Sequence, residues 1–323
     1  MSRLSTLIDG RIPAARAKLY YTVRPDDPAE QEMPISWYPG HMHKARKELA
    51  RAMGESDLLI EVLDARTPLA SSNPMLADIR GARPCLRILN KADLADLEIT
   101  RHWLDHFRQS PGNACLVNGL DQRINKADIV AACEQLAGYP EHAPGKTRQA
   151  FITGIPNVGK STLLNQIVDR KLAKTGNEPA VTKGQQRVRL NENWALIDTP
   201  GLLWPRLADQ DAAYRLACTG TIRNTAVDAE DIAWFAAEML LDRFYDKVQS
   251  RYHLPDKPES AEQLLLAIAK QRGCISRQGT VDWHKTAEQL LNDFRTGRLG
   301  RLSLESPPAA THDRPESMRK EPE

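Results

Sequence analysis

The segment from Gly154 to Ser161, with the sequence GIPNVGKS, has the residue spacing of a phosphate-binding loop. It follows an apolar stretch around Phe151 and precedes a helical pattern over 162–167, which is the order of strand, loop and helix in such loops. Glycines let backbone N–H groups turn toward a β-phosphate, and the helix start adds partial positive charge. We expect Lys160 to bridge the β- and γ-phosphates and Ser161 to bind Mg²⁺; a chance glycine-rich turn is the alternative. The expected nucleotide contacts in this loop are Asn157, Val158, Gly159, Lys160, Ser161 and Thr162.

A second phosphate-side motif, Asp198-Thr199-Pro200-Gly201, begins 38 residues after Lys160 at the end of an apolar stretch. A carboxylate at Asp198 can hold the water shell of Mg²⁺, and the Gly201 N–H can contact a γ-phosphate. Between the two motifs, the Thr182 hydroxyl is expected to complete the metal shell only when a γ-phosphate is bound. The alternatives are a plain strand-ending turn at Asp198 and a solvated loop threonine at Thr182.

Guanine recognition needs a carboxylate that accepts hydrogen bonds from both the ring N–H and the exocyclic amine, a pattern that adenine lacks. The tetrapeptide Asn90-Lys91-Ala92-Asp93 follows the apolar stretch 85–89 and can supply it. We expect Asp93 to accept both hydrogen bonds, Asn90 to brace the neighbouring loop, and the Lys91 stem to lie across the base. These roles predict a preference for GTP and GDP.

Two further segments concern the base. Asn118-Gly119 ends the apolar stretch 114–117, where a backbone N–H is expected to meet the guanine carbonyl. The letters NKAD recur at 125–128, but no strand precedes this copy and a helical pattern follows it. We therefore interpret the second copy as a helix start.

The chain has 323 residues, of which 44 are basic and 42 acidic, for a net charge of +2. This balance excludes a polycation that binds nucleic acid by bulk charge, and no apolar run is long enough to span a membrane. The five cysteines have neither zinc-ligand nor disulfide-framework spacing, so they are expected to be reduced core residues without a disulfide partner. Residues 1–8 contain no long apolar segment, so we expect no secretory signal and a cytoplasmic protein.

Short apolar stretches that alternate with helical patterns predict an α/β domain with a largely parallel sheet over residues 35–207. Residues 208–304 show only helical spacing and predict an all-helical second domain. Residues 1–34 are expected to form an extension, and residues 305–323 a disordered tail. The predicted strands are Leu58–Leu63, Cys85–Leu89, Ala114–Val117, Ala150–Thr153, Gln186–Leu190 and Trp194–Ile197.

The order of these motifs is unusual, because most guanine-nucleotide switches place the phosphate loop before the NKxD element and here Asn90 precedes Gly154. A circular permutation explains this order, since domain termini often lie close enough to be joined. The join is expected at 139–146 and the new opening just after Gly201. The segment 202–205 then links the γ-phosphate contact covalently to the helical domain and would transmit the nucleotide state to it.

At this point the chain resembles the YlqF/RbgA family of circularly permuted ribosome-assembly GTPases over about residues 36–305. The resemblance implies a circularly permuted Ras-like P-loop G domain, a helical RNA-contacting domain, and a role in maturing the large ribosomal subunit. Tyr38 stands where the family usually has Phe, and Asn118-Gly119 replaces commoner pairs, but neither departure removes a phosphate or metal contact. Besides the motif order, the resemblance rests on Trp37-Tyr38-Pro39-Gly40-His41-Met42, Asp64-Ala65-Arg66-Thr67-Pro68, Asp198-Thr199-Pro200-Gly201 with Leu202-Leu203-Trp204-Pro205, and Arg272-Gly273-Cys274.

Slow intrinsic hydrolysis is expected, because Leu202 occupies the place where Ras-type enzymes carry a water-orienting Gln. The resemblance points to His41 as a substitute; a polar residue at a helix start is the alternative. Asn157 stands where similar loops hold K⁺ beside the phosphates, although it could simply shape the loop. For Asp64, which follows a predicted strand, we favour the capping of a turn over any chemistry.

Basic residues interleaved with Trp283 and His284 make the helical domain a candidate RNA surface, although such a small charge excess is often only a solvated face. With the resemblance, we favour rRNA of the large subunit as the partner of a monomeric protein. The alternative function is a nucleotide-gated RNA-binding module with incidental hydrolysis; a P-loop ATPase or kinase is disfavoured by the placement of Asp93. The basic residues are Lys270, Arg272, Arg277, Lys285, Arg295, Arg298 and Arg301, with Lys44, Arg46, Lys47 and Arg51 as a second candidate surface.

Overall fold

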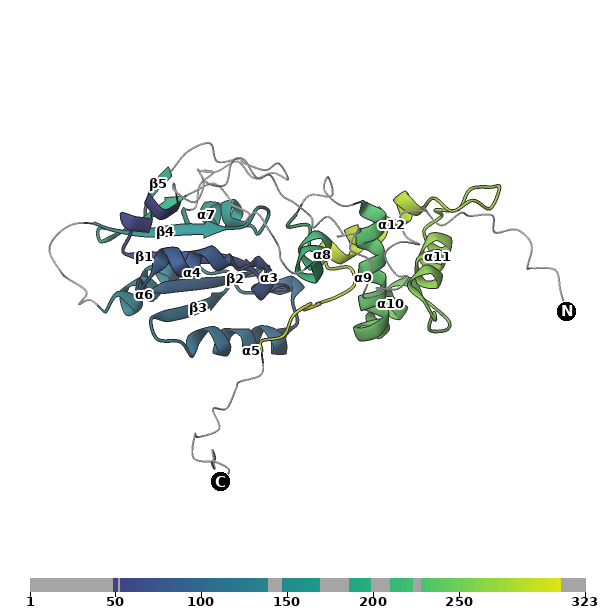
Figure 1. Ribbon diagram of the computed structural model, residues 1–323, viewed down its shortest axis with the longest axis horizontal. Helices are drawn as coiled ribbons and strands as arrows, with labels where there is room; N and C mark the ends of the chain where they lie inside the picture. Colours follow the sequence, from purple (N-terminus) through teal and green to yellow (C-terminus); the bar gives the residue numbers. More distant parts are fainter. Residues whose placement is uncertain are drawn as a thin grey trace, which may run out of the picture.

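Two lobes, one built on a β-sheet and one of helices only, form the part of the chain that the structure describes (Figure 1). The structure is a computed structural model, and it describes residues 49–138 except Ala52, 147–168, 186–198, 210–222 and 228–308. The predicted extension, the expected join at 139–146 and the segment 202–205 lie outside these residues. The α/β lobe comes first in the chain and the helical lobe second, as the sequence predicts.

The first lobe contains a six-stranded sheet in the order β3-β2-β1-β4-β6-β5. All neighbouring strands are parallel except β5, which pairs antiparallel with β6, so the prediction of a largely parallel sheet is confirmed. The strand β4 pairs with β1 and β6, which places the predicted phosphate loop at the centre of the sheet. The strands are β1 (Leu58–Asp64), β2 (Cys85–Asn90), β3 (Asn113–Val117), β4 (Arg148–Gly154), β5 (Gln186–Arg189) and β6 (Trp194–Asp198).

Helices cover both faces of this sheet, as expected for parallel strands whose side chains are buried on both sides. Alternate residues of β1 point to opposite faces: Ile60 packs with α6 and α7, whereas Leu63 packs with Trp103 of α5. A short 3-10 turn at 92–94 lies between β2 and α5. The helices of this lobe are α3 (Pro68–Ser71), α4 (Pro74–Arg80), α5 (Leu97–Arg108), α6 (Lys126–Ala137) and α7 (Lys160–Val168).

The second lobe is an all-helical bundle in which α9 contacts each of the other helices. Most of its core residues are leucine, alanine and isoleucine at helical spacing, such as Ile232, Leu240 and Leu264. The Ser260 hydroxyl accepts a hydrogen bond from the Gln263 N–H and caps α11, and Asp282 caps α12 in the same way. The helices are α8 (Gln210–Cys218), α9 (Ala229–Arg243), α10 (Tyr245–Tyr252), α11 (Ala261–Gln271) and α12 (Trp283–Arg295).

The helix α8 belongs to both hydrophobic cores. Ala213 and Leu216 pack into the core of the first lobe, whereas Ala217 and Cys218 pack into the core of the helical lobe. After α12 the chain returns to the first lobe and ends its described part near α5, as the yellow segment of Figure 1 shows. The two lobes therefore pack against each other at α8 and at the carboxyl end of the described chain.

The predicted start of a disordered tail at Glu305 is wrong for that residue. Glu305 is buried, and its carboxylate accepts hydrogen bonds from the Leu69 and Ala70 N–H groups of α3 at 2.7 and 3.1 Å. The sequence pattern missed this contact because its partner lies 235 residues away in the chain. Residues 309–323 lie outside the described part.

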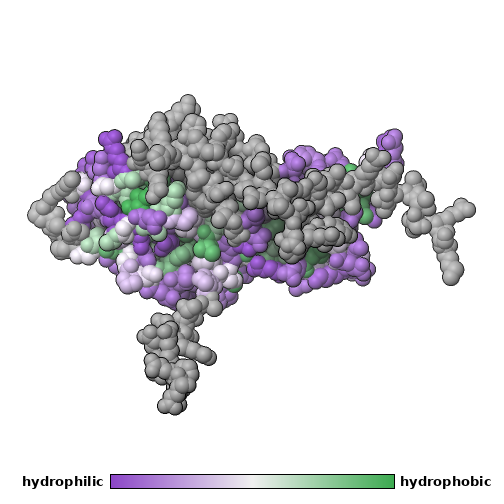
Figure 2. All heavy atoms as spheres, in the orientation of Figure 1, coloured by the Kyte–Doolittle hydropathy of each residue, from purple (hydrophilic) through white to green (hydrophobic). Residues whose placement is uncertain are grey.

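Among the described residues, hydrophilic side chains lie mainly on the surface (Figure 2) and the cysteines lie in the interior. On the face seen in Figure 2, hydrophilic side chains cover most of the described surface of both lobes. All five cysteines are buried and free, and burial raises the pKa to about 11 at Cys85 and to about 12 at Cys115, Cys133 and Cys218. The thiols of these last four cysteines stay protonated and unreactive near neutral pH. None of the helices among the described residues is long and apolar enough to cross a membrane.

Candidate functional site

The sequence-predicted site residues that the structure describes gather at one edge of the sheet. The five parallel strands β1, β2, β3, β4 and β6 all end at this edge, because parallel strands share one carboxyl side. Asp64, Asn90, Gly154 and Asp198 are the last residues of their strands, and Asn118 directly follows β3. Motifs that are separated by more than 130 residues therefore meet at one place, from Asp64 to Asp198.

The phosphate loop runs from the end of β4 to the start of α7, and two of its glycines are required by close contacts. A Cβ atom at Gly154 would lie 2.8 Å from the Val62 carbonyl oxygen. Gly159 has a φ of +95°, and a Cβ atom there would lie 2.3 Å from the Asn90 side-chain amide nitrogen. Only glycine fits this conformation and this space at once. The contact also shows how tightly the phosphate loop lies against the NKAD element.

Replacing Gly159 with alanine should weaken nucleotide binding by roughly 10- to 100-fold, because the new methyl group displaces Asn90 and strains the loop backbone. The measurement is the affinity for a fluorescent GDP analogue. The matched control is Gly112→Ala, which has a φ of +71° but nothing within 4 Å of its Cβ position. This control should lose some stability and keep its affinity; equal losses of affinity in both variants would contradict the role assigned to the contact.

The first NKAD copy holds the phosphate loop through two backbone carbonyls. The Asn90 side chain donates a hydrogen bond to the Val158 carbonyl at 2.8 Å, and the Lys91 Nζ donates to the Asn157 carbonyl at 2.8 Å. Lys91 has a left-handed backbone with a φ of 58°, which turns its side chain back toward the loop. The base-side and phosphate-side motifs therefore form one connected unit.

Asp64 lies at the centre of a buried network that its sequence pattern does not predict. Its carboxylate accepts from Lys91 Nζ at 3.0 Å and from both nitrogens of the Arg66 fork at 2.9 and 2.8 Å. Burial would raise the pKa of Asp64, but Arg66 and Lys91 outweigh it and hold that pKa well below its usual value. Asp64 also accepts the Arg66 backbone N–H as a turn cap would, at 3.1 Å. The turn interpretation is therefore incomplete, because the same carboxylate fixes the lysine of the NKAD element.

The second base-side segment contacts Asp93 directly. The Leu120 N–H donates to Asp93 Oδ1 at 3.0 Å, and a Cβ atom at Gly119 would lie 2.7 Å from the Asp93 backbone nitrogen. The Asn118 side chain donates to Asn90 Oδ1 at 2.7 Å. The Gly119 N–H itself donates to the Gln122 carbonyl at 3.0 Å. The loop after β3 and the NKAD loop are thus held together by contacts at Asn90 and at Asp93.

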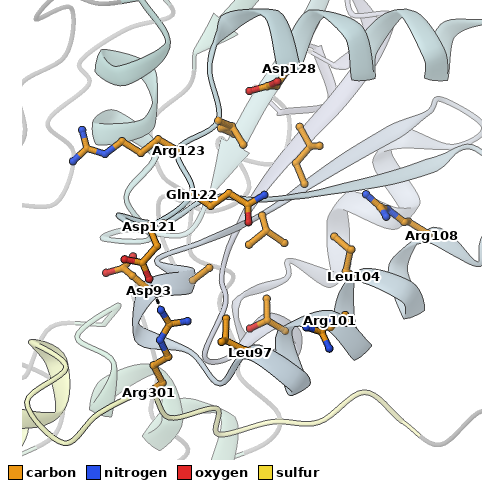
Figure 3. A pocket seen from close by; sticks show the side chains of 16 residues that line it. Asp93, Leu97, Arg101, Leu104, Arg108, Asp121, Gln122, Arg123, Asp128 and Arg301 are labelled. Atoms are coloured by element: carbon orange, nitrogen blue, oxygen red, sulfur yellow. Dashed lines mark hydrogen bonds and ion pairs between the residues drawn. The ribbon is translucent and has the colours of Figure 1, made fainter.

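A cavity of about 560 Å³ opens beside Asp93, between α5, β3 and the turn before α6 (Figure 3). Asp93 and Ala92 line it from the NKAD loop, and Gly119 lines it from the loop after β3. Arg101 and Arg108 of α5 lie toward the other end of the close-up, away from Asp93. The two candidate base-recognition loops therefore border an open space large enough for a ligand.

The second NKAD copy is confirmed as a helix start. Asn125 is the N-cap of α6, and its side chain accepts from the Ala127 and Asp128 N–H groups at 2.7 and 3.2 Å. The Asn125 N–H in turn donates to the Asp128 carboxylate at 2.7 Å, which completes a capping box. These side chains are used in capping the helix, which explains the sequence of the second copy.

Lys160 and Asp198 form a buried ion pair at the phosphate end of the site. The strands β4 and β6 are in register with Ile152 beside Asp198, so this carboxylate reaches the start of α7. A carboxylate and the neighbouring Ser161 hydroxyl are hard oxygen ligands of the kind that Mg²⁺ prefers. The oxygen atoms of Ser161 and Asp198 therefore fit a magnesium ion, which these residues would hold.

Three predicted site residues, His41, Thr182 and Gly201, lie outside the described residues. The structure therefore gives no position for the expected water-orienting histidine, for the expected metal ligand Thr182 or for the expected γ-phosphate contact at Gly201. The interpretation of these residues stays a prediction from the sequence.

The phosphate loop and the network around Asp64 also contact the helical lobe. The Asn157 side-chain amide donates to the Gly220 carbonyl at 3.3 Å, and the Arg66 guanidinium donates to the Thr219 carbonyl at 3.1 Å. Both carbonyls lie in the turn after α8. The amide group that was considered for K⁺ therefore faces the helical lobe in this structure.

Among the basic residues of the helical lobe, three arginines surround one buried carboxylate. Arg251, Arg272 and Arg298 pair with Asp293 at 2.8, 2.8 and 3.3 Å. Burial would raise the pKa of Asp293, but these arginines lower it, so the group carries an excess positive charge. This excess makes their partly exposed side chains candidates for phosphate contact.

Two other members of the predicted basic set, Arg295 and Arg301, contact protein instead. Arg295 donates to the Ala217 carbonyl at 2.8 Å, and Arg301 pairs with Asp121. Of the second candidate surface only Arg51 is described, and it is exposed and lies 3.7 Å from Glu55.

Comparison with known proteins agrees with this arrangement. Residues 149–248 match the family model described as a 50S ribosome-binding GTPase. Ribosome biogenesis GTPase A of Bacillus cereus is 38% identical over 281 residues, which cover 85% of this chain and 95% of that protein. Mitochondrial ribosome-associated GTPase 1 of Xenopus tropicalis is 31% identical over 83% of this chain and 94% of its own length.

The fold has a counterpart among solved structures. GNP-bound YlqF from T. maritima aligns with a TM-score of 0.58 at 22% identity, over 82% of this chain and 98% of the other. The GDP-bound YlqF structure aligns with a TM-score of 0.56. The P-loop fold and the permuted order of its motifs agree with the prediction, and the identity to the curated relatives extends over both lobes. The chain therefore belongs to the ribosome biogenesis GTPase A (YlqF/RbgA) family, and it is a GTPase.

Proposed function

We propose that this GTPase acts as a switch in late assembly of the large ribosomal subunit, with slow intrinsic turnover that the ribosomal particle stimulates. The observation that carries the proposal is the bracing of the phosphate loop by Asn90 and Lys91, because it makes base recognition and phosphate binding one unit. The relatives named for ribosome biogenesis and the family model named for 50S binding support the choice of particle.

In the proposed mechanism, Asp93 accepts the two hydrogen bonds that distinguish guanine, and a backbone N–H at Asn118-Gly119 meets the guanine carbonyl. The N–H groups of residues 157–162 surround the phosphates, and Lys160 leaves Asp198 to neutralise phosphate charge. Mg²⁺, when bound, neutralises charge on the β- and γ-phosphates. Ser161 and Asp198, with Thr182, would hold it, and Gly201 would contact the γ-phosphate.

The proposed partner is rRNA of the large subunit. The arginines around Asp293 support it, because one buried carboxylate orients three positive side chains at the surface of the helical lobe. Guanidinium groups bind phosphate in a fork geometry, and such contacts position a protein on RNA. We propose a monomer in the cytoplasm as the acting form.

The test of this function is GTP turnover with and without purified large ribosomal subunits, in K⁺ buffer and then in Na⁺ buffer. We expect subunits to raise the rate constant at least 10-fold, since the place of the Ras glutamine is taken by Leu202. Stimulation in K⁺ alone would support an ion held by Asn157. Single-turnover hydrolysis that subunits leave unchanged would favour the alternative, a nucleotide-gated RNA-binding module with incidental hydrolysis.

Replacing His41 with alanine should lower the subunit-stimulated turnover by roughly 100-fold without weakening GTP affinity, because a water-orienting group acts in the transition state. The measurements are stimulated turnover and the equilibrium affinity for a GTP analogue. His43→Ala, two residues away in the same segment, is the matched control. An unchanged stimulated rate would remove His41 from the mechanism.

A further inference from the structure

We propose that residues 301–305, here called the strap, form a positioning element of the guanine site. The strap ties the two base-recognition loops to the helical lobe, so that the affinity for guanine nucleotides depends on this contact. The proposal rests on the proposed function of Asp93 and of Asn118-Gly119 in binding the base. It concerns a different part of the chain from the expected covalent connection at 202–205.

The strap first contacts the NKAD loop. The Leu302 N–H donates to the Leu94 carbonyl at 2.9 Å, and the Ser303 hydroxyl accepts from the Asp96 N–H at 3.1 Å. Leu94 is the residue directly after Asp93. These hydrogen bonds hold the backbone of the loop on the carboxyl side of the residue that is expected to read guanine.

The strap also contacts the loop after β3. Arg301 forms an ion pair with Asp121, which Figure 3 shows as a dashed line close to Asp93. Asp121 follows Leu120, whose N–H donates to Asp93 Oδ1 at 3.0 Å. The two loops that border Asp93 are therefore both bound to neighbouring residues of one extended segment.

The other side of the strap is anchored in the helical lobe. Leu302 and Leu304 are both 2% exposed and belong to the helical core, and Arg243 donates to the Leu304 carbonyl at 3.0 Å. The turn after α12 adds a close approach, because a Cβ atom at Gly297 would lie 2.7 Å from the Leu94 side chain. A shift of the helical lobe would therefore move or release the backbone at Leu94.

The end of the strap fixes its path along the first lobe. The Leu304 N–H donates to the Arg66 carbonyl at 2.8 Å, and the Trp103 ring nitrogen donates to the Glu305 carbonyl at 3.2 Å. The Glu305 carboxylate also binds α3, so the end of the strap contacts the first lobe at three places: Arg66, α5 and α3. Since binding couplings are reciprocal, nucleotide binding should also tighten the strap.

The experiment compares the dissociation rate of a fluorescent GDP analogue from the full chain and from the double variant Arg301→Ala with Ser303→Ala. We expect dissociation to accelerate about 5- to 10-fold, from one partly exposed ion pair and one hydrogen bond. Lys257→Ala is the matched control, because it removes an equal charge from a side chain that contacts Tyr245 within the helical lobe. It should change the rate less than 2-fold.

Charge reversal tests the ion pair separately. Arg301→Asp and Asp121→Arg should each accelerate dissociation, and the two together should return the rate to within about 2-fold of that of the unaltered chain. Hydrogen exchange supplies a readout without mutation: GDP should slow exchange of the Leu302 and Leu304 amides. A general loss of stability would not be rescued by the double charge reversal. It would also not explain protection of the Leu302 and Leu304 amides that depends on GDP.

The outcomes separate the strap from the base site. In one outcome, Asp93→Asn weakens GTP binding, the strap variant releases GDP at the unaltered rate, and GDP does not change hydrogen exchange at the Leu302 and Leu304 amides. The strap proposal is then overturned and the base assignment stands. If Asp93→Asn leaves GTP affinity unchanged while the strap variant accelerates dissociation, the base assignment fails and the coupling stands.

Discussion

Asp93→Asn should lower the affinity for GTP roughly 1,000-fold and make XTP the preferred nucleotide. The loss follows from two charge-assisted hydrogen bonds, each contributing on the order of 1.5–3 kcal/mol. Xanthine carries an oxygen where guanine has the exocyclic amine, and the asparagine amide can donate to that oxygen. Asparagine keeps the Oδ1 atom that accepts from Leu120, so the loop contact survives the change. Competition of XTP and GTP for a bound fluorescent nucleotide measures both effects.

The second NKAD copy provides a matched control for this exchange. Asp128→Asn makes the same chemical change in the same four-residue context, but its side chain belongs to the capping box of α6. It should leave the preference for GTP intact. A switch to XTP in Asp128→Asn, or its absence in Asp93→Asn, would show that the base site is assigned to the wrong residue.

Arg66→Ala should lower the free energy of unfolding by about 3–5 kcal/mol, because it leaves a buried carboxylate with one of its two cationic partners. Arg66 is 1% exposed, and it also supplies the hydrogen bond to Thr219 in the helical lobe. Urea denaturation followed by circular dichroism measures the change. The control is Arg101→Ala, which removes an exposed pair with Glu98 and should change the free energy of unfolding by less than about 1 kcal/mol.

The cost of Arg66→Ala should depend on pH with a defined sign. The pKa of Asp64 is held below its ordinary value of 3.8, although burial alone would raise it, because Arg66 and Lys91 favour the charged form. The stability from this carboxylate is therefore fully present above pH 3.8 and is lost as the pH falls further. We expect the difference in the free energy of unfolding between the unaltered chain and Arg66→Ala to be largest near neutral pH and to shrink below about pH 4. An equal loss of unfolding free energy at neutral pH and below about pH 4 would contradict the charge network.

The gathering of the candidate site residues at one edge of the sheet could be predicted because it depends on local patterns. The GIPNVGKS loop and the first NKAD copy each follow an apolar strand, and parallel strands must bring such ends to one edge. The second NKAD copy lacks that strand, and the prediction that it starts a helix is confirmed. The strands themselves differ from prediction by a residue or two at their ends, where hydrogen bonding rather than apolar pattern decides the limit.

The parts that the sequence did not predict are contacts between distant residues. Asp64 has the pattern of a turn residue, and only the pairing of β1 with β2 brings it to Lys91. The alternation of polar Arg301, Ser303 and Glu305 with apolar residues is the signal of an extended segment with two faces, but it does not identify the loops that those faces contact. Such contact partners can be identified only from the tertiary structure.

The sharing of α8 between two cores has a consequence for a chain that is still being synthesised. The strands of the first lobe end at Asp198, but its core also needs Ala213 and Leu216, and its base loops are bound by residues 301–305. Because a ribosome adds residues in order from the amino end, the sheet emerges well before the segments that complete it. The proposed guanine site is then complete only after the helical lobe has been made. Retention of GDP would thus begin when both lobes are present, and a shorter nascent chain would release the nucleotide quickly.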